Sequence, residues 1–175
     1  MNIVSIPALP ETEGRSPTGK YHSFSKDISL ALGGIKDTGA WGGGHPFDLQ
    51  QRRVPPGASV CPLHAHTQQF ELFIVLAGTA SVRTVRPATS DPLAASASEW
   101  SASATHTVRA GDAFAQPPGT AHQITNTGTE DLIFFVIADN LPTDSTFYPE
   151  SNKWQIKPQR KLFRMTEVDY FDGEE

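Results

Sequence analysis

Short segments in which apolar and polar residues alternate recur through the middle of the chain. A period of two is typical of β-strands that bury one face. The segments that fit a strand best are residues 47–54, 70–76, 79–85 and 132–138, and residues 28–32 fit an edge strand. Turn signals such as Pro55-Pro56-Gly57 and Pro117-Pro118-Gly119 separate them. The pattern therefore predicts an all-β protein with many short strands.

The segment 70–76 is apolar on both of its faces, apart from one carboxylate. Alternation assigns Glu71, Phe73 and Val75 to the inner face of this strand. Its other face then carries the outward row Phe70, Leu72, Ile74 and Leu76. An outward apolar row needs cover from a second layer, an arm or another subunit. The segment 132–138 has the same two-sided character, so its outward row needs cover in the same way.

The ends of the chain differ from its middle. Residues 1–26 contain three prolines and read as an extended N-terminal arm, residues 27–140 as the β-domain, and residues 141–175 as a C-terminal extension. Within residues 88–105, eleven of eighteen positions are alanine or serine. That composition predicts a low-complexity loop inserted in the domain, in which Trp100 is the one aromatic residue.

Four side chains with metal-binding chemistry stand in two short motifs. His64 and His66, two residues apart, share one face of a strand. A bend after His66 can return Glu71 beside the two imidazoles, and His122 can join them from a distant strand. The spacing therefore predicts that His64, His66, Glu71 and His122 bind one metal ion.

Three imidazoles and one carboxylate suit a divalent transition metal, namely Fe, Mn, Zn, Ni or Co. Four protein ligands leave positions open for water or substrate, which is the layout of a catalytic site. The remaining histidines have no partner at ligand spacing and are interpreted as ordinary polar residues: His22, His45 and His106. We interpret Asn126 as a turn residue.

The two motifs together resemble the cupin family. The second motif has that family's pattern at Gly111, Pro117, Gly119, His122 and Asn126. The first has it at His64, His66, Glu71 and Gly78, with one residue more than usual between Gly57 and the first histidine. The resemblance implies a double-stranded β-helix, or jelly-roll barrel, with the metal inside near one mouth, and pairing of two subunits through apolar strands.

Three kinds of function remain open for such a barrel. The first is an enzyme of the sugar-phosphate isomerase type, acting on a small oxygenated metabolite. The second is a non-haem iron dioxygenase, and the third is a non-catalytic module that binds or senses a metabolite. The candidate pocket residues are Arg52, Gln69, Phe73, Val75, Arg83, Phe114, Gln116 and Ile124. An isomerase needs cationic groups facing the pocket, and alternation allows only one of Arg52 and Arg53 inside.

Composition narrows the class of partner. A net charge of −5 without a basic stripe argues against nucleic acid. One cysteine, Cys61, allows no internal disulfide and suits a reducing compartment. Neither a signal peptide nor a membrane span is visible in the sequence. We therefore expect a cytoplasmic protein whose partners are a small-molecule ligand and a second copy of itself, with no membrane or nucleic acid.

Overall fold

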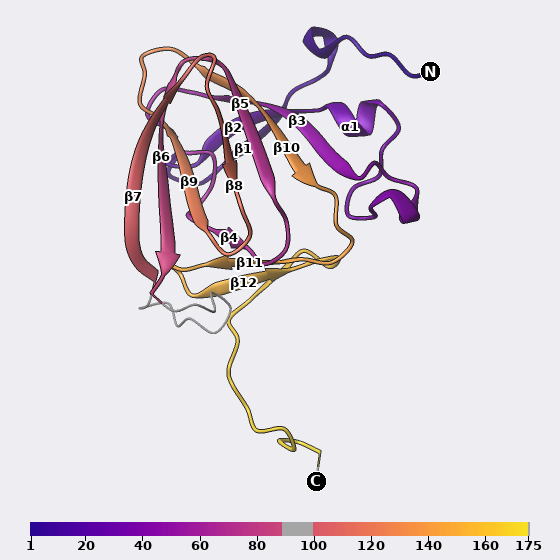
Figure 1. Cartoon of the computed structure of the whole chain (residues 1–175), viewed down its shortest axis with the longest axis vertical. Coiled ribbons are helices and arrows are strands. Elements are labelled where there is room, and N and C mark those ends of the chain that lie inside the picture. The colour runs from indigo at the N-terminus through magenta and orange to yellow at the C-terminus, as the bar shows by residue number, and fades with distance from the viewer. Residues whose placement is uncertain (89–99, 175) are drawn as a thin grey trace.

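The computed structural model describes residues 1–88 and 100–174, and these form a β-protein built of antiparallel strands (Figure 1). The largest sheet has six strands in the order β1 (Thr12–Arg15), β2 (His22–Asp27), β3 (Phe47–Val54), β10 (Leu132–Asp139), β5 (Glu71–Ala77) and β8 (Ala113–Gln116). A three-stranded sheet faces it, in the order β7 (Trp100–Arg109), β6 (Thr79–Pro87) and β9 (Ala121–Asn126). The two sheets form the jelly-roll barrel that the sequence predicted.

The core lies between these two sheets. Inward side chains of β3, β5 and β10 meet those of β6 and β9, and the main cluster includes Val54, Phe73, Val82, Ile124 and Phe134. The burial pattern of β5 alternates as the sequence predicted, with Glu71, Phe73 and Val75 buried and the intervening residues more exposed. Burial of these apolar side chains is the main source of the barrel's stability.

The hairpin between β5 and β6 depends on a glycine. Gly78 has a φ of 82°, in the left-handed region that favours glycine. A Cβ at this position would lie 2.8 Å from the backbone oxygen of Asp131, so the neighbouring chain also excludes a side chain. The turn therefore fixes where β5, and with it Glu71, enters the barrel.

A third sheet runs across one end of the barrel (Figure 1). Its strands are β13 (Lys161–Phe163), β12 (Lys153–Ile156), β11 (Ser145–Tyr148) and β4 (Ala65–His66). A second apolar cluster fastens this sheet to the barrel, where Phe147 packs between Trp100 and Trp154. The C-terminal extension is thus part of the wall around the barrel mouth, while residues 164–174 extend away from it.

Two segments of the predicted N-terminal arm join the main sheet as β1 and β2, after a short 3-10 turn at Ile6–Ala8. The expected edge strand at 28–32 is wrong, because Ile28–Ala31 form one helical turn, α1. Ile28 and Ser29 are buried against β3, and Gly33 with a φ of 92° ends the turn. A second 3-10 turn, Ala40–Gly42, lies in the glycine-rich loop that leads to β3.

The expected loop at 88–105 is only partly a loop. Residues 100–105 belong to β7, which pairs with β6 along its length. Trp100 is buried in the second cluster, so it anchors the start of β7. The rest of the expected loop, residues 89–99, lies outside the described residues.

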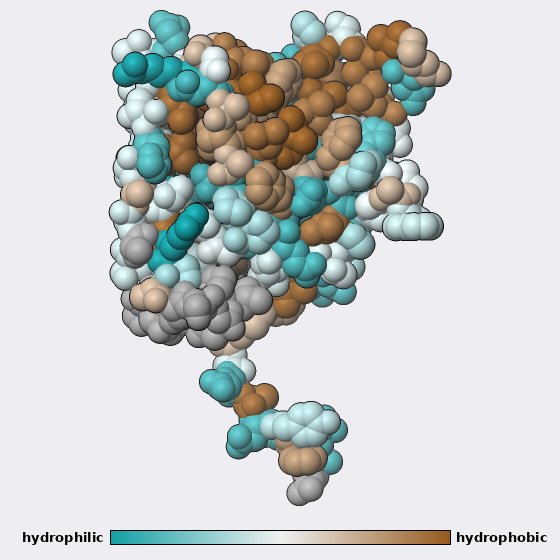
Figure 2. Space-filling view, viewed as in Figure 1, coloured by the Kyte–Doolittle hydropathy of each residue, from teal (hydrophilic) through white to brown (hydrophobic). Residues whose placement is uncertain are grey.

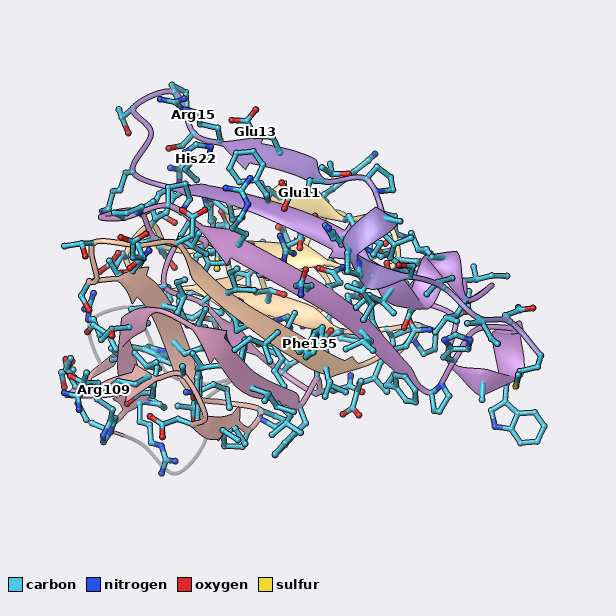
Figure 3. The ribbon with its side chains drawn as sticks, turned by 90° about the horizontal axis from the view of Figure 1, so that it is seen from above. Glu11, Glu13, Arg15, His22, Arg109 and Phe135 are labelled. Atoms are coloured by element: carbon cyan, nitrogen blue, oxygen red, sulfur yellow. The ribbon has the colours of Figure 1, made fainter. Side chains whose placement is uncertain are left out.

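The outer face of the six-stranded sheet is apolar over β5 and β10. Figure 2 shows hydrophobic side chains gathered over the region where Figure 1 draws β5, β10 and β3. Phe135 lies on β10 in the middle of this sheet, whereas Glu11, Glu13, Arg15 and His22 lie at its β1–β2 edge (Figure 3). Pairing of two copies through this face stays a prediction. Within the described residues, no helix is long and apolar enough to cross a membrane.

Candidate metal centre

Two backbone hydrogen bonds bring the two histidine motifs together. The amide of His122 donates to the carbonyl of His64 at 2.8 Å, and the amide of His64 donates back at 3.2 Å. The two side chains therefore leave the backbone directly opposite each other, and their ring centroids lie 4.6 Å apart. His66 follows on β4, with its ring centroid 5.1 Å from that of His64.

Glu71 begins β5 and brings its carboxylate to the three imidazoles. Its Oε2 atom lies 3.0 Å from Nε2 of His122, and its Oε1 atom lies 3.9 Å from Nε2 of His66. One ligand atom from each of His64, His66 and Glu71 falls within 4.8 Å of the others. The backbone therefore gathers all four predicted side chains in one place, although they come from three separate segments.

Burial and mutual charge set the ionisation of this group. Burial on its own would raise the pKa of Glu71, but the adjacent His122, together with His66 and His64, holds that pKa well below its usual range. Burial lowers the pKa of His122, and the charge of His64 lowers it further. A carboxylate anion beside a neutral imidazole is the state that a metal ion requires of these ligands.

Outer contacts orient two of the imidazoles. Nδ1 of His66 lies 2.6 Å from Oδ2 of Asp144, and Nδ1 of His64 donates to the carbonyl of Pro62 at 2.9 Å. Asp144 is held in turn by Thr67 and by the amide of Gln68, each at 3.0 Å. Because Nδ1 of His64 and of His66 is engaged, Nε2 of each ring is left for a metal ion.

Unpaired buried atoms test whether a cation fits. Among the described residues, Oε2 of Glu71 is buried without a well-aligned hydrogen bond, although Nε2 of His122 lies 3.0 Å away, and Nδ1 of His122 is buried without a partner. A buried carboxylate oxygen without a partner costs free energy, and a divalent cation would satisfy it. With the donor chemistry of nitrogen and oxygen, His64, His66 and Glu71 could hold a metal ion, and His122 lies beside them.

Two cavities meet at Glu71. The inner one, of about 160 Å³, is mainly apolar, and its lining includes Val60, Phe73, Ile124, Phe134 and Val136 beside His64 and His122. The outer one, of about 220 Å³, is polar, and its lining includes Asp48, Gln50, Gln69, Lys157 and Arg160 beside His66. Arg52, Glu71 and Val136 line both. A ligand at the candidate metal centre would therefore contact an apolar wall and a charged wall.

The predicted pocket residues fall into four groups. Arg52, Gln69, Phe73 and Ile124 line the two cavities beside Glu71. Val75 lies in the apolar core, while Phe114 and Gln116 line a third cavity of about 400 Å³, together with residues of β6 and β7. Arg83 pairs with Glu150 at 2.6 Å on an exposed part of β6.

The two neighbouring arginines of β3 point in opposite directions. Arg53 pairs with Glu11 at 2.7 Å and Asp131 at 3.0 Å, and its guanidinium stacks over Phe24. Arg52 has no ion-pair or hydrogen-bond partner among the described residues, and it lines both cavities. The inner guanidinium is thus free to bind a ligand.

Sequence reasoning missed several polar groups at the cavity. Asp48 and Gln50 share the strand parity of Arg52, so alternation along β3 could have found them. Burial raises the pKa of Asp48, and its Oδ1 atom is buried without a partner among the described residues. Asp144 and Lys157 follow no motif, so only the fold brings them to the centre.

Cys61 lies at the inner cavity, with its sulfur 3.5 Å from Nδ1 of His64. Burial, with a smaller contribution from the charge of Glu71, raises the pKa of its thiol to about 12. The side chain therefore remains a neutral thiol near neutral pH.

A family model and several solved structures are similar to this chain. The family model described as Cupin matches residues 49–161. Among solved structures, the chain is similar to a protein from Acidithiobacillus ferrooxidans described provisionally as a sugar phosphate isomerase, with 20% identity, a TM-score of 0.69, and coverage of 94% of this chain and 90% of that one. None of the curated proteins gives a significant match.

Two further structures have the same fold. A sugar phosphate isomerase from a cupin superfamily, from Silicibacter pomeroyi, has 18% identity and a TM-score of 0.65, and the alignment covers 92% of this chain and 90% of that one. A predicted oxalate decarboxylase from Thermotoga maritima has 20% identity and a TM-score of 0.56, with coverage of 79% and 99%. At these identities, the likeness shows the fold alone.

Proposed function

Since the chain belongs to the cupin family, we propose that it is a metal-dependent enzyme acting on a small, oxygenated and anionic metabolite. The reaction proposed is an isomerisation of the sugar-phosphate type, in which one proton moves between two neighbouring carbons and the hydroxyl proton passes to the former carbonyl oxygen. His64, His66, Glu71 and His122 would hold the metal. When bound, the metal would supply Lewis-acid polarisation of a carbonyl or hydroxyl oxygen.

One observation carries this proposal: a free cation and a proton acceptor stand opposite the candidate metal ligands. Asp48 on β3 is paired with Ala138 on β10, and Ala138 is paired with Glu71 on β5. With strands spaced by about 4.8 Å, the backbones at Asp48 and Glu71 are about 10 Å apart. The small side chain of Ala138 leaves this space open for a substrate.

Each group on the β3 wall has a chemical role in the proposal. Arg52 binds an anionic oxygen of the substrate, since its guanidinium has no competing carboxylate among the described residues. Asp48, whose pKa is raised by burial, takes the proton from the carbon beside the carbonyl and returns it to the neighbouring carbon. The apolar residues of the inner cavity exclude water from the carbanion-like state.

Proton exchange with solvent tests this proposal. The metal-loaded protein is incubated in deuterium oxide with a panel of aldose and ketose phosphates, and NMR follows both isomerisation and deuterium at the carbon beside the carbonyl. We expect exchange that depends on the metal and is lost in Asp48→Asn. Absence of exchange and of isomerisation with every metal ion and every substrate of the panel would contradict the proposal.

A dioxygenase is the second candidate, and the apolar inner cavity favours it. Phe73, Ile124 and Phe134 line this cavity of about 160 Å³ beside His64 and His122. An apolar pocket of that kind suits an uncharged, oxidisable substrate. Oxygen consumption that requires ferrous iron and is insensitive to Arg52→Gln would support the dioxygenase over the isomerase.

A further inference from the structure

The loop of residues 33–46 is fastened over the outer cavity by one buried amide. Asn140 donates to the carbonyl oxygens of Ile35 and His45, at 2.8 and 2.9 Å. Its own Oδ1 accepts the backbone amide of Asp37 at 2.6 Å. This side chain, only 5% exposed, therefore fixes the position of Asp37 beside the cavity.

The carboxylate of Asp37 lies between two cations of the C-terminal extension. Oδ1 lies 3.1 Å from Nζ of Lys157, and Oδ2 accepts Nε of Arg160 at 2.6 Å. Asp37 also has a φ of 59°, in the left-handed region that a residue with a side chain adopts at a cost. A strained backbone conformation persists only where surrounding contacts hold it in place, and such residues are frequent at ligand sites.

This cluster faces the candidate metal centre. Asp37, Lys157 and Arg160 all line the outer cavity of about 220 Å³ that Glu71 and His66 also line. Lys157 donates to Oε1 of Gln69 at 2.7 Å, and Nε2 of Gln69 lies 3.4 Å from Oε1 of Glu71. Only one side chain therefore separates Lys157 from a candidate metal ligand.

We propose that Lys157 and Arg160 form an anion site for a phosphate group, and that Asp37 is a built-in occupant which the ligand displaces. A phosphate carries more negative charge than a carboxylate and offers three acceptor oxygens, so it competes well for an ammonium and a guanidinium that already converge. This proposal depends on the proposed function in one respect: both take the outer cavity as the substrate pocket. Asp37 would then select for ligands whose charge is large enough to replace it.

A purely structural role for Asp37 and a role in an anion site lead to different expected effects of Asp37→Asn. If Asp37 only fastens the loop to the extension, Asp37→Asn weakens the protein and gains nothing. If Asp37 occupies an anion site, the same change frees two cations and removes a competing charge. Asparagine suits the test because it tolerates the left-handed φ of this position and is nearly the same size.

Calorimetric titration of inorganic phosphate into the metal-free full chain distinguishes the structural role of Asp37 from its role in an anion site. We expect Asp37→Asn to bind phosphate about tenfold or more tightly than the wild type, because a like charge has left the site. The gain should be lost when Lys157→Met or Arg160→Gln is added to Asp37→Asn. Asp131→Asn is the matched control, since it removes a carboxylate paired with Arg53 on the outside of the sheet.

Equal phosphate affinity in the wild type and Asp37→Asn would overturn the proposal. So would a gain that survives the loss of both cations or that Asp131→Asn reproduces. The titration needs neither metal nor turnover, so it is independent of the isomerase assay. Asp37-dependent phosphate binding without isomerisation would contradict the proposed function alone, and isomerisation without such binding would contradict this site alone.

Discussion

The imidazole of His66 and the carboxylate of Asp144 lie 2.6 Å apart, although 78 residues separate them in the chain. The contact joins β4 to the start of β11, and so couples the candidate metal centre to the C-terminal extension. Burial would raise the pKa of Asp144, but the hydrogen bond and charge of His66, together with hydrogen bonds from Gln68 and Thr67, lower it, so this carboxylate is ionised at neutral pH. Such a partner fixes the ring of a metal-binding histidine and raises its basicity.

Replacing Asp144 therefore tests the orientation of His66. We expect Asp144→Asn to lower metal affinity by about 10- to 100-fold, because the ring loses its anionic partner but keeps a possible hydrogen bond. Competition with a chelator of known affinity measures the change. Asp112→Asn serves as a control, since Asp112 accepts the amide of Arg109 in the turn between β7 and β8. Unchanged affinity in Asp144→Asn would contradict the orienting role given to Asp144.

Removing a proposed ligand should have a larger effect. We expect His122→Ala to lose most of its bound metal and to keep the barrel, because apolar burial supplies most of the stability. Elemental analysis and far-UV circular dichroism measure the two quantities. His106→Ala is the matched control, an exposed histidine of β7 away from Glu71. Full metal content in His122→Ala would show that His122 is not a ligand that the metal needs.

The adjacent arginines of β3 provide an internal comparison. If Arg52 binds the anionic oxygen of the substrate, Arg52→Gln lowers kcat/KM by roughly 10- to 100-fold, as expected for the loss of a charged hydrogen bond. Arg53→Gln should leave kcat/KM unchanged, because its guanidinium pairs with Glu11 and Asp131 outside the barrel. Steady-state kinetics of both variants measures the difference. Equal losses in the two variants would contradict the role given to Arg52.

Asp48 should lower the stability of the protein at pH values where its carboxyl group is ionised. Burial raises its folded-state pKa above the ordinary value of 3.8, so the unfolded chain releases this proton more readily than the folded one. The charge therefore destabilises the protein above the folded pKa, and the penalty disappears as pH falls toward the unfolded value. We expect Asp48→Asn to unfold at higher denaturant concentration than the wild type at pH 7, with a smaller difference near pH 4. A difference that is constant or larger in acid would contradict this.

Much of the barrel could be predicted because its evidence is local. The period of two along β5 and β10, and glycines such as Gly78, depend only on neighbouring residues. The segment 28–32 misled the prediction, since a mostly apolar run of five residues fits a strand or a helical turn equally well. Here the burial of Ile28 against β3 and the glycines after Leu32 favour the turn.

The candidate site could be predicted only in part, because some of its residues stand in short motifs and others are brought there by the fold. His64, His66, Glu71 and His122 stand in short motifs, so their spacing alone indicated a common centre. Asp144, Lys157 and Asp37 reach the cavity through the pairing of β11 with β4 and through the loop held by Asn140. Contacts of that kind depend on the packed fold and leave no periodic pattern in the sequence.

Metal content measured together with stability tests the central claim most directly. The protein is purified without an affinity tag, analysed for metals, and unfolded thermally before and after chelation. We expect about one equivalent of a divalent transition metal per chain, and a fall in the unfolding midpoint on chelation, because the folded state binds the ion. Absence of metal, together with no stabilisation by any added divalent ion, would contradict it.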